Sequence, residues 1–358
     1  MIAQTMPALA RRLGRRPHEA LSWARYVALH EAIRLPLTGL HRLAFRVAGQ
    51  RAARDEALEQ TVRRRYRELL RQDFRNARSG LYPMELLFDV PLRGYARRLP
   101  RFLLDTPGVL RRLRSGDFRD LPGNVDLEAF PPYYRQTFHW QTDGYFSRRS
   151  AELYDLGVEL LFVGCADVMR RQALAEVMKR RPAGEVRVLD VGTGTGRFLD
   201  QLARSLPGSD LVGVDLSPWY ADYARGSSSA GAARATARRG LRIEVGNAEA
   251  LPFEAGSFDV VTNVFMLHEL PRRVRRAVLH EVRRVLVPGG LLVIMDAAQL
   301  SESLELAPAL HQFSKDLHEP YFTDYLRDDL RALLEESGFR VEHVAPHFVA
   351  KVVSARVQ

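Results

Sequence analysis

Short apolar runs recur through the second half of the chain, separated by longer stretches that mix polar, charged and apolar residues. Such runs lie at 188–191, 211–215, 243–245, 258–264 and 291–296. Apolar runs bounded by glycine, proline and acidic residues are typical of strands buried in a sheet. The stretches between them are long enough for helices. This alternation predicts an α/β domain with a largely parallel sheet.

The first of these runs leads into a loop with glycine at every second position. Asp190 lies at the end of the run, and Gly192, Gly194 and Gly196 follow just before a predicted helix start. Glycine tolerates a positive φ and lets a ligand approach the main chain. The amides of a helix N-terminus add free hydrogen-bond donors. The loop is therefore predicted to hold a nucleotide-like ligand.

The spacing of the glycines narrows the choice of ligand. The pattern is Gly-x-Gly-x-Gly, whereas dinucleotide-binding loops read Gly-x-Gly-x-x-Gly and phosphate loops end in Gly-Lys-Ser/Thr. Asp215 ends the next apolar run, where a carboxylate can accept hydrogen bonds from ribose hydroxyls. Dehydrogenases and methyltransferases both use this position, so Asp215 alone does not separate them.

Three downstream blocks separate these two classes. They are segment 243–253, segment 257–270, and the turn Val285-Leu286-Val287-Pro288-Gly289-Gly290 before the run at 291–296. Together with the first two runs they resemble the class I S-adenosylmethionine-dependent methyltransferases, and most of all their ubiquinone/menaquinone biosynthesis branch, over residues 165–358. The resemblance implies a doubly wound α/β fold with a seven-stranded sheet, whose last strand, near 347–353, is antiparallel. A helical N-terminal extension is expected to precede this domain.

The resemblance also implies S-adenosylmethionine as the cofactor and a role for each matched position. Gly192, Gly194 and Gly196 would face its methionine part. Asp190 would reach the amino group directly or through water, and the backbone around Asn263 would help to seat that group.

The nucleoside half of the cofactor would meet a second set of positions. Asp215 would bind the ribose hydroxyls, and Leu216 would pack on the adenine. Asn247 and Ala248 would border the adenine. Related proteins usually have aspartate at the position of Asn247; an amide oxygen still accepts a hydrogen bond but lacks the charge, so we expect weaker cofactor binding.

Length, cysteine content and hydropathy limit the class of protein. The 358 residues allow one large domain or two moderate ones. The single cysteine, Cys165, excludes an intrachain disulfide and fits a reducing compartment. The sequence offers no metal cluster of the Cys/His type, and no metal is expected. Without a long apolar run or the core of a signal peptide, the chain is expected to be cytoplasmic, with membrane association left open.

Charge is distributed unevenly along the chain. Residues 1–120 contain about 25 Arg against about 12 acidic residues, although the whole chain carries a formal net charge of +10. We therefore divide the chain into a basic helical region (1–120), an aromatic-rich connector and lid (121–181) and the methyltransferase domain (182–358). The glycine- and serine-rich segment 226–231 is expected to be a flexible break.

The basic region admits three interpretations. In segment 92–104, arginines alternate with leucine and aromatic residues, as in helices that lie on an anionic membrane surface. Arginines with interspersed aromatics can instead grip phosphates and stack bases. The third interpretation is a helical cap with a solvated arginine face.

The connector and the loops after the strands supply candidates for the acceptor site. Segment 130–146 is dense in aromatics and prolines and suits a flat or long apolar acceptor; His139 is its catalytic candidate. A helical pattern runs from Ser150 to about Arg181. His268, after the fourth strand, is the best general-base candidate, whereas Glu269 is better explained as a charge at a helix start.

The connection after the fifth strand is a further source of pocket residues. Its polar and aromatic candidates are His311, Lys315, His318, Glu319, Tyr321 and Phe322. A helix is predicted from about residue 323 to 337, with Gly338 as its stop.

These observations predict methyl transfer from S-adenosylmethionine to a small or lipid-like acceptor, at oxygen or carbon, with a quinol-type ring as one possibility. A nucleic-acid methyltransferase is the second hypothesis, although segment 263–266 reads Asn-Val-Phe-Met rather than the Asn/Asp-Pro-Pro-Tyr/Phe type that holds a base amino group. A non-catalytic cofactor-binding subunit that uses the basic arm as an interaction surface is the third. The oligomeric state stays open.

Overall fold

The computed structural model describes residues 17–47, 55–226 and 241–358. Most of the predicted break after Gly226, and parts of the basic region (1–16 and 48–54), lie outside these ranges, and the side chains of 40–47 are not described.

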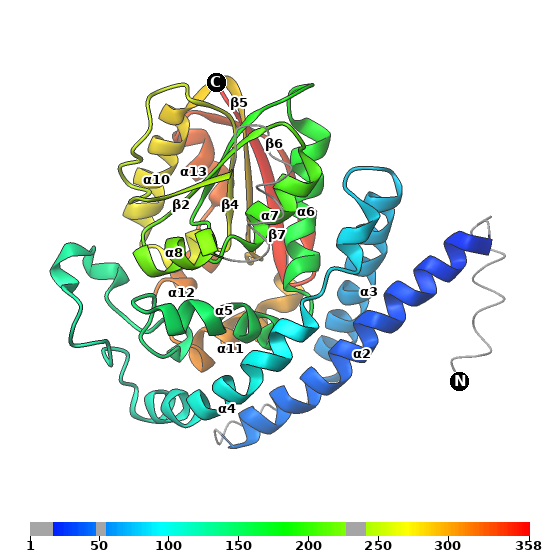
Figure 1. Ribbon diagram of the computed structural model, residues 1–358, viewed down its shortest axis with the longest axis vertical. Helices are drawn as coiled ribbons and strands as arrows, with labels where there is room; N and C mark the ends of the chain where they lie inside the picture. Colours follow the sequence, from blue (N-terminus) through cyan, green and yellow to red (C-terminus); the bar gives the residue numbers. More distant parts are fainter. Residues whose placement is uncertain (1–16, 48–54, 227–240) are drawn as a thin grey trace.

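Seven strands form one sheet in the order β3-β2-β1-β4-β5-β7-β6 (Figure 1). β7 runs antiparallel to β5 and β6, and the other neighbouring strands are parallel. The predicted doubly wound fold with an antiparallel last strand is therefore confirmed. The strands are β1 Arg187–Val191, β2 Asp210–Asp215, β3 Leu241–Val245, β4 Phe258–Val264, β5 Leu286–Ala297, β6 Phe339–His347 and β7 Ala350–Val357.

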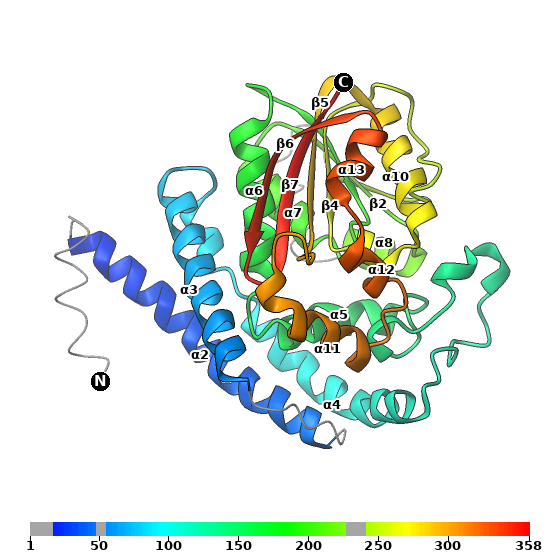
Figure 2. The same cartoon turned by 180° about the vertical axis from the view of Figure 1, so that it is seen from behind.

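Helices cover both faces of this sheet because alternate strand residues point to opposite sides. Val188 and Val260 belong to the core shared with α6 and α7, whereas Leu189 and Val261 belong to the core shared with α10, α12 and α13. Figure 2 shows the two groups of helices on either side of the strands. The helices of this half are α6 Ala166–Arg180, α7 Arg197–Ser205, α8 Pro218–Gly226, α10 Arg272–Val285, α11 Ala307–Asp316, α12 Phe322–Arg327 and α13 Leu330–Glu336.

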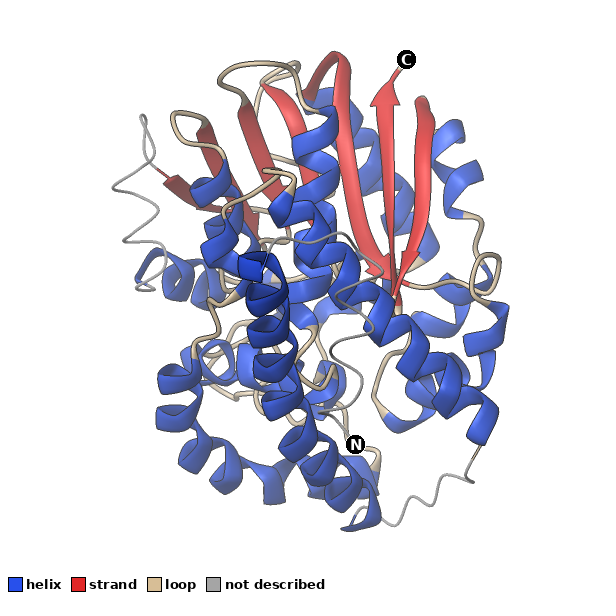
Figure 3. Cartoon of the chain, turned by 90° about the vertical axis from the view of Figure 1, so that its right-hand side faces the viewer, coloured by secondary structure: helices blue, strands red, loops and turns tan. Residues whose placement is uncertain are grey.

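Within the described residues, four more helices precede the sheet. They are α2 Pro17–Val47, α3 Glu56–Arg78, α4 Leu92–Ser115 and α5 Arg148–Leu161. α3 packs on α6 and α4 packs on α5, so the helical region lies along one face and one end of the sheet (Figures 1 and 3). The described part of the basic region is thus mostly helical. The division of the chain after residues 120 and 181 stays a prediction. Among the described helices, none has the length and apolar character needed to cross a membrane.

The single helix predicted from Ser150 to Arg181 is wrong, because α5 and α6 are separated by a turn. Val163 and Gly164 in this turn have φ of 47° and 82°. A Cβ at Gly164 would lie 2.6 Å from Ile33 of α2, so the close approach of α2 requires glycine. Glu159 accepts hydrogen bonds from the amides of residues 166 and 167 and caps α6.

The helix predicted over 323–337 is also divided. α12 ends at Arg327, and the Asp329 carboxylate accepts a hydrogen bond from the Ala332 amide to start α13. Asp328, between the two helices, pairs with Arg275, whose side chain is fully buried. This pair comes from α10, so the local sequence pattern does not reveal it.

Candidate functional site

The carboxyl ends of β1, β2 and β4 meet at one edge of the sheet, because β1 lies between the other two. Asp190 on β1 is in register with Gly213 of β2 and Thr262 of β4. Gly192, Gly194 and Gly196 follow with φ of 74°, 57° and 79°, values that favour glycine. This edge therefore carries a loop whose main chain turns sharply beside two acidic strand ends.

Two of these glycines have different surroundings. A Cβ at Gly192 would lie 2.7 Å from the Met266 sulfur, so a side chain is excluded there. A Cβ at Gly194 would meet nothing within 4 Å. The loop is therefore packed against the protein at its first glycine and faces open space at its second.

Asp190 and Asp215 are carboxylates held inside this edge. Asp190 accepts a 2.6 Å hydrogen bond from the Thr262 hydroxyl. Asp215 accepts from the amides of Gly194 (2.8 Å) and Ser217 (2.9 Å). Burial raises the pKa of both carboxyls to about 6, although these donors oppose the shift. Two desolvated carboxylates side by side favour a ligand with cationic and hydrogen-bond-donating groups.

A cavity of about 120 Å³ opens on the glycine loop. Asp190, Asp215 and Leu216 line it on the sheet side. Tyrosines from the connector, α5 and α8 line the other side: Tyr134, Tyr145, Tyr154 and Tyr220. Small-molecule sites usually enclose about 300 Å³ or more, so some of these rings have to shift when a nucleoside-sized ligand enters.

A second, larger cavity of about 420 Å³ adjoins the first. Its walls are mostly apolar and come from α4, α5 and α11, with His139 and His268 at its polar end. Tyr154, Phe265 and Glu269 line both cavities. A polar ligand at the glycine loop and an apolar ligand under α4 would therefore meet at these three residues.

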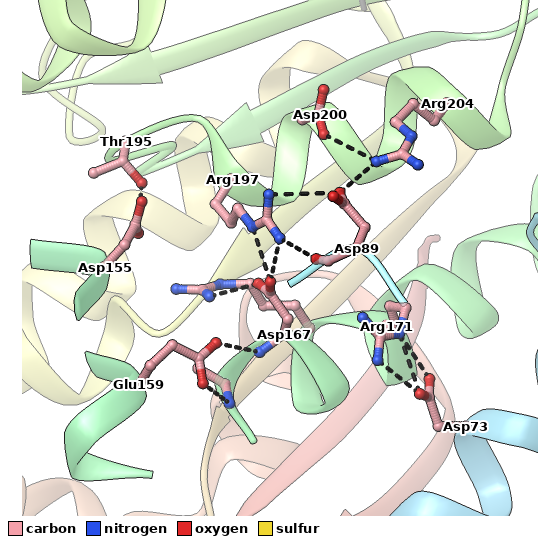
Figure 4. Close-up of polar contacts among 12 residues, drawn as sticks. Asp73, Asp89, Asp155, Glu159, Asp167, Arg171, Thr195, Arg197, Asp200 and Arg204 are labelled. Carbon is pink, nitrogen blue, oxygen red and sulfur yellow. Dashed lines mark hydrogen bonds and ion pairs between the residues drawn. The ribbon is translucent and has the colours of Figure 1, made fainter. Parts of the chain in front are cut away.

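The glycine loop is tied to the helical region by ion pairs (Figure 4). Arg197, the first residue of α7, donates to the Asp167 carboxylate at 2.5 and 2.8 Å and to the Asp89 carbonyl at 2.8 Å. The Thr195 hydroxyl donates to Asp155 of α5 at 2.9 Å. Arg197 and Asp167 are both largely buried, so the α2–α6 region fixes the start of α7 and the loop before it.

Comparison with known proteins agrees with this geometry. A family model described as a methyltransferase domain matches residues 188–290. The chain is 38% identical over 146 residues to a demethylmenaquinone methyltransferase of Deinococcus radiodurans, covering 41% of this chain and 56% of that protein. It is 34% identical over 177 residues to a ubiquinone/menaquinone biosynthesis C-methyltransferase of a Geobacter species, covering 49% of this chain and 68% of that protein.

The chain belongs to the class I S-adenosylmethionine-dependent methyltransferases, in their ubiquinone/menaquinone biosynthesis branch. S-adenosylmethionine is accordingly the cofactor of this methyltransferase. The matched part of the chain spans 56% and 61% of the length of two demethylmenaquinone methyltransferases, from Deinococcus radiodurans and Thermus thermophilus. A solved S-adenosylmethionine-dependent methyltransferase of Aquifex aeolicus aligns with 51% of this chain and 88% of its own, at 22% identity and a TM-score of 0.39.

The edge of the sheet that carries the glycine loop has features that fit this cofactor. Gly194 faces open space, as close approach of a ligand to the main chain requires. Asp190 is a buried carboxylate beside that space and suits an ammonium group. The side-chain oxygen of Asn263 is buried and has no hydrogen-bond partner among the described residues.

The structure brings together only some of the residues predicted to bind the cofactor. Those that line the first cavity are Asp190, Gly192, Gly194, Asp215 and Leu216. Outside that lining are Gly196, Asn247, Ala248 and Asn263. The cofactor contacts of all nine stay predictions.

The residues outside the lining have structural contacts of their own. The side-chain amide of Asn263 donates a 2.8 Å hydrogen bond to the Val191 carbonyl. Asn247 accepts from the Glu249 amide at 2.9 Å, which forms a local turn. Ala248 packs against the core on the α10 face, and a Cβ at Gly196 would lie 3.2 Å from Ala224.

His268, the predicted general base, is paired with a carboxylate that was not a candidate. Its Nδ1 lies 2.5 Å from Asp296 at the end of β5. Burial lowers the pKa of His268, but Asp296 outweighs burial and the net shift raises the pKa to about 10. The imidazole in this state keeps its proton at neutral pH, which disfavours a general-base role.

His268 is also one of four side chains whose polar atoms converge, three of them buried and His139 half-buried. Ligand atoms of His139, His268, Glu269 and Glu319 all lie within 4.8 Å of one another. His139 Nε2 is in direct contact with a Glu319 carboxylate oxygen. The Tyr145 hydroxyl donates to Glu269 at 2.6 Å. Glu269 lies in the short helical turn Leu267–Glu269, but it is buried and is therefore part of the site.

Only part of this cluster can be predicted from the sequence. His139, His268 and Glu319 are candidates there, but as separate residues on three segments. Glu269 was not a site candidate, and burial followed by repulsion from Glu319 raises its pKa to about 7. His318, also a candidate, is not among these four residues, and its Nε2 pairs with Gln136 at 2.6 Å.

Proposed function

We propose that this protein transfers a methyl group from S-adenosylmethionine to a lipid-like acceptor with a quinol-type ring, at oxygen or carbon. The observation that carries the proposal is the apolar cavity of about 420 Å³, which shares Tyr154, Phe265 and Glu269 with the cavity at the glycine loop. The ubiquinone and menaquinone methyltransferases among its relatives support the same acceptor class.

The cofactor would be held by the strand ends. Asp190 would bind the amino group, Asp215 the ribose hydroxyls, and the main chain around Gly194 the methionine part. Bound there, S-adenosylmethionine supplies an electrophilic methyl group on a sulfonium. The two carboxylates stay hydrogen-bonded to Thr262 and to loop amides, so they are oriented before the cofactor arrives.

The acceptor would be positioned by the apolar cavity. Phe102 and Leu110 of α4, Leu153 and Leu161 of α5, and Phe313 of α11 contribute to its walls. An isoprenoid or acyl tail would bury apolar surface there. Its ring would then lie toward the shared residues, and holding two reactants in line supplies much of the rate of a displacement reaction.

The tyrosines of the first cavity would exclude water. Tyr134, Tyr145 and Tyr220 belong to one packed aromatic cluster with Phe138 and Tyr154. Rings that close over the cofactor keep water from the reacting centre. The polar cluster with His139 and Glu269 lies where the ring hydroxyls of the acceptor would reach.

The helix α4 is suited to receive the lipid-like acceptor from the cytoplasmic surface of a membrane. Leu103 and Leu104 are 51% and 78% exposed, and Leu103 also lines the apolar cavity. Exposed arginines, such as Arg97 and Arg101, lie on the same helix. Apolar side chains flanked by arginine favour an anionic lipid surface, so we propose peripheral membrane contact through this helix.

The test is transfer of labelled methyl from S-adenosylmethionine to a host lipid extract, followed by organic extraction. The proposal predicts label in the organic phase with the wild type and none with Asp215→Ala. Label only in the aqueous phase or on macromolecules would refute the lipid-like acceptor. No transfer to any fraction despite tight cofactor binding would favour the non-catalytic subunit.

A further inference from the structure

Four ionisable side chains meet at the polar end of the apolar cavity and have the composition of a metal site. His139 comes from the connector, His268 and Glu269 from the turn after β4, and Glu319 from the loop between α11 and α12. Their ligand atoms lie within 4.8 Å of one another. Metal–ligand bonds of about 2.0–2.2 Å place two ligand atoms at most about 4 Å apart, so a small contraction brings all four around one ion.

Glu319 is the side chain whose surroundings most require a cation. It is 4% exposed, and beyond the contact of one oxygen with His139 Nε2, neither carboxylate oxygen has a hydrogen-bond partner among the described residues. A buried carboxylate costs several kcal/mol unless an opposite charge compensates it. Glu269 lies beside it and adds a second negative group.

Neighbouring groups hold two of the four side chains as they hold ligands in metalloproteins. Asp296 pairs with His268 Nδ1, so Nε2 is the ring nitrogen that would bind the ion, releasing its proton to water as the ion enters. Tyr145 binds one oxygen of Glu269, which leaves the other oxygen. Carboxylate–histidine pairs of this kind orient metal-bound imidazoles and fix their tautomer.

The backbone at His139 is strained. His139 and Trp140 have φ of 55° and 59°, which non-glycine residues rarely adopt and which costs about 1–3 kcal/mol each. The turn is held by Arg112, which donates to the Trp140 carbonyl at 3.0 Å, and by the Trp140 indole, which donates to the Asp316 carbonyl at 3.1 Å. These contacts from distant elements direct His139 into the cluster.

We propose that His139, His268, Glu269 and Glu319 bind a divalent first-row transition metal ion such as Zn²⁺, Fe²⁺ or Mn²⁺. Two imidazoles and two carboxylates form a mixed nitrogen and oxygen set, which favours these ions over Ca²⁺ or Mg²⁺ and over Cu⁺. The His139–Glu319 contact opens when the ion enters between them.

The position of the site suggests a role, which rests on the proposed function. His139, His268 and Glu269 line the acceptor cavity, and Glu269 also borders the cofactor cavity. A ring hydroxyl of the acceptor that binds the ion through oxygen loses its proton to water, and the metal–oxygen bond replaces the O–H bond. Metal coordination lowers the pKa of a bound hydroxyl, so the acceptor becomes nucleophilic at neutral pH.

The test begins with metal analysis of protein purified without a histidine tag or chelator. The proposal predicts about one equivalent of a transition metal per chain. After chelation, addition of Co²⁺ to the wild type should produce visible d–d absorption, which Zn²⁺ then displaces. This readout needs no variant and no activity.

Matched variants test the ligands. Glu319→Gln and His139→Asn should weaken Zn²⁺ binding by about 100-fold or more, and Asp296→Asn by about 10–100-fold. His318→Asn changes the neighbouring histidine outside the cluster and should bind Zn²⁺ as the wild type does. Circular dichroism verifies that each variant folds.

Two results would overturn the proposal: a wild type that contains no metal and gives no Co²⁺ spectrum, or Zn²⁺ affinity that is equal in Glu319→Gln, His139→Asn and the wild type. Failure of the proposed function is distinguishable. Metal binding without methyl transfer would support the metal site and refute the proposed function. Undiminished methyl transfer by a protein that contains and binds no metal would support the function and refute the metal site.

Discussion

The substitution Asp190→Asn should make the protein more stable at neutral pH and weaken its cofactor binding. Burial raises the pKa of Asp190 from 3.8 to about 6. Below pH 4 the carboxyl is protonated in both the folded and unfolded states, so its burial carries no free-energy penalty for desolvating a charge. Between pH 4 and 6 the unfolded chain loses the proton first. Stability contributed by the protonated form is therefore lost as the pH rises through 6.

The magnitude follows from the shift. About two pKa units at 1.36 kcal/mol each correspond to about 3 kcal/mol between pH 4 and pH 7. Asparagine keeps an oxygen that accepts from Thr262, but its NH₂ group needs a new partner, which costs about 1 kcal/mol. We therefore expect Asp190→Asn to be more stable than the wild type by about 2 kcal/mol at pH 7.5 and slightly less stable at pH 4.

Urea unfolding of the cofactor-free proteins across this pH range measures the difference. Asp222→Asn, a substitution of an aspartate on the surface beside Arg148, should follow the wild-type profile and serves as the control. Calorimetry should show about 10–100-fold weaker S-adenosylmethionine binding by Asp190→Asn at pH 7.5, because the ammonium group loses a charged partner. Parallel stability profiles for Asp190→Asn and the wild type would refute the reasoning.

Three further substitutions test separate parts of the account. Asp215→Ala removes two ribose hydrogen bonds to a charged group and should weaken cofactor binding by about 100-fold; unchanged affinity in calorimetry would refute the ribose assignment. Arg197→Met breaks a buried pair with Asp167 and should lower the free energy of unfolding by about 3 kcal/mol; a loss below about 1 kcal/mol in urea would contradict the bracing role. The double change of Leu103 and Leu104 to Glu should abolish sedimentation with anionic vesicles, and retained binding would exclude α4 as the membrane contact.

Five of the seven strands could be predicted from the sequence because an apolar run marks each of them locally, whereas the seven-stranded sheet with its antiparallel last strand followed from the family resemblance. Val188 to Val191, for example, is an apolar run closed by glycine, and Asp190 and Asp215 could be assigned to the carboxyl edge once the strands were recognised. The boundaries of the helices were harder to predict from the sequence. The break at Gly164 depends on contact with Ile33, which no local pattern contains.

The polar cluster could not be predicted as a unit. His139 and Glu319 are adjacent in space, although they lie in different halves of the chain. Asp296 lies near the end of β5, and nothing in its own segment of sequence pairs it with His268. Contacts of this kind depend on how distant loops pack at the sheet edge, which the periodicity of one segment does not encode.

Entry of the acceptor into the apolar cavity beside the cofactor can be tested directly with one substitution. Gly157 of α5 lines that cavity, and a Cβ there would meet only Phe102, at 3.7 Å, so Gly157→Phe should fill the space without breaking the helix. The measurement is single-turnover transfer of labelled methyl to a prenylated quinol, with S-adenosylmethionine affinity determined on the same samples. We expect transfer by the wild type, and a loss of transfer in Gly157→Phe with cofactor affinity unchanged. Equal transfer by Gly157→Phe and the wild type would contradict this expectation.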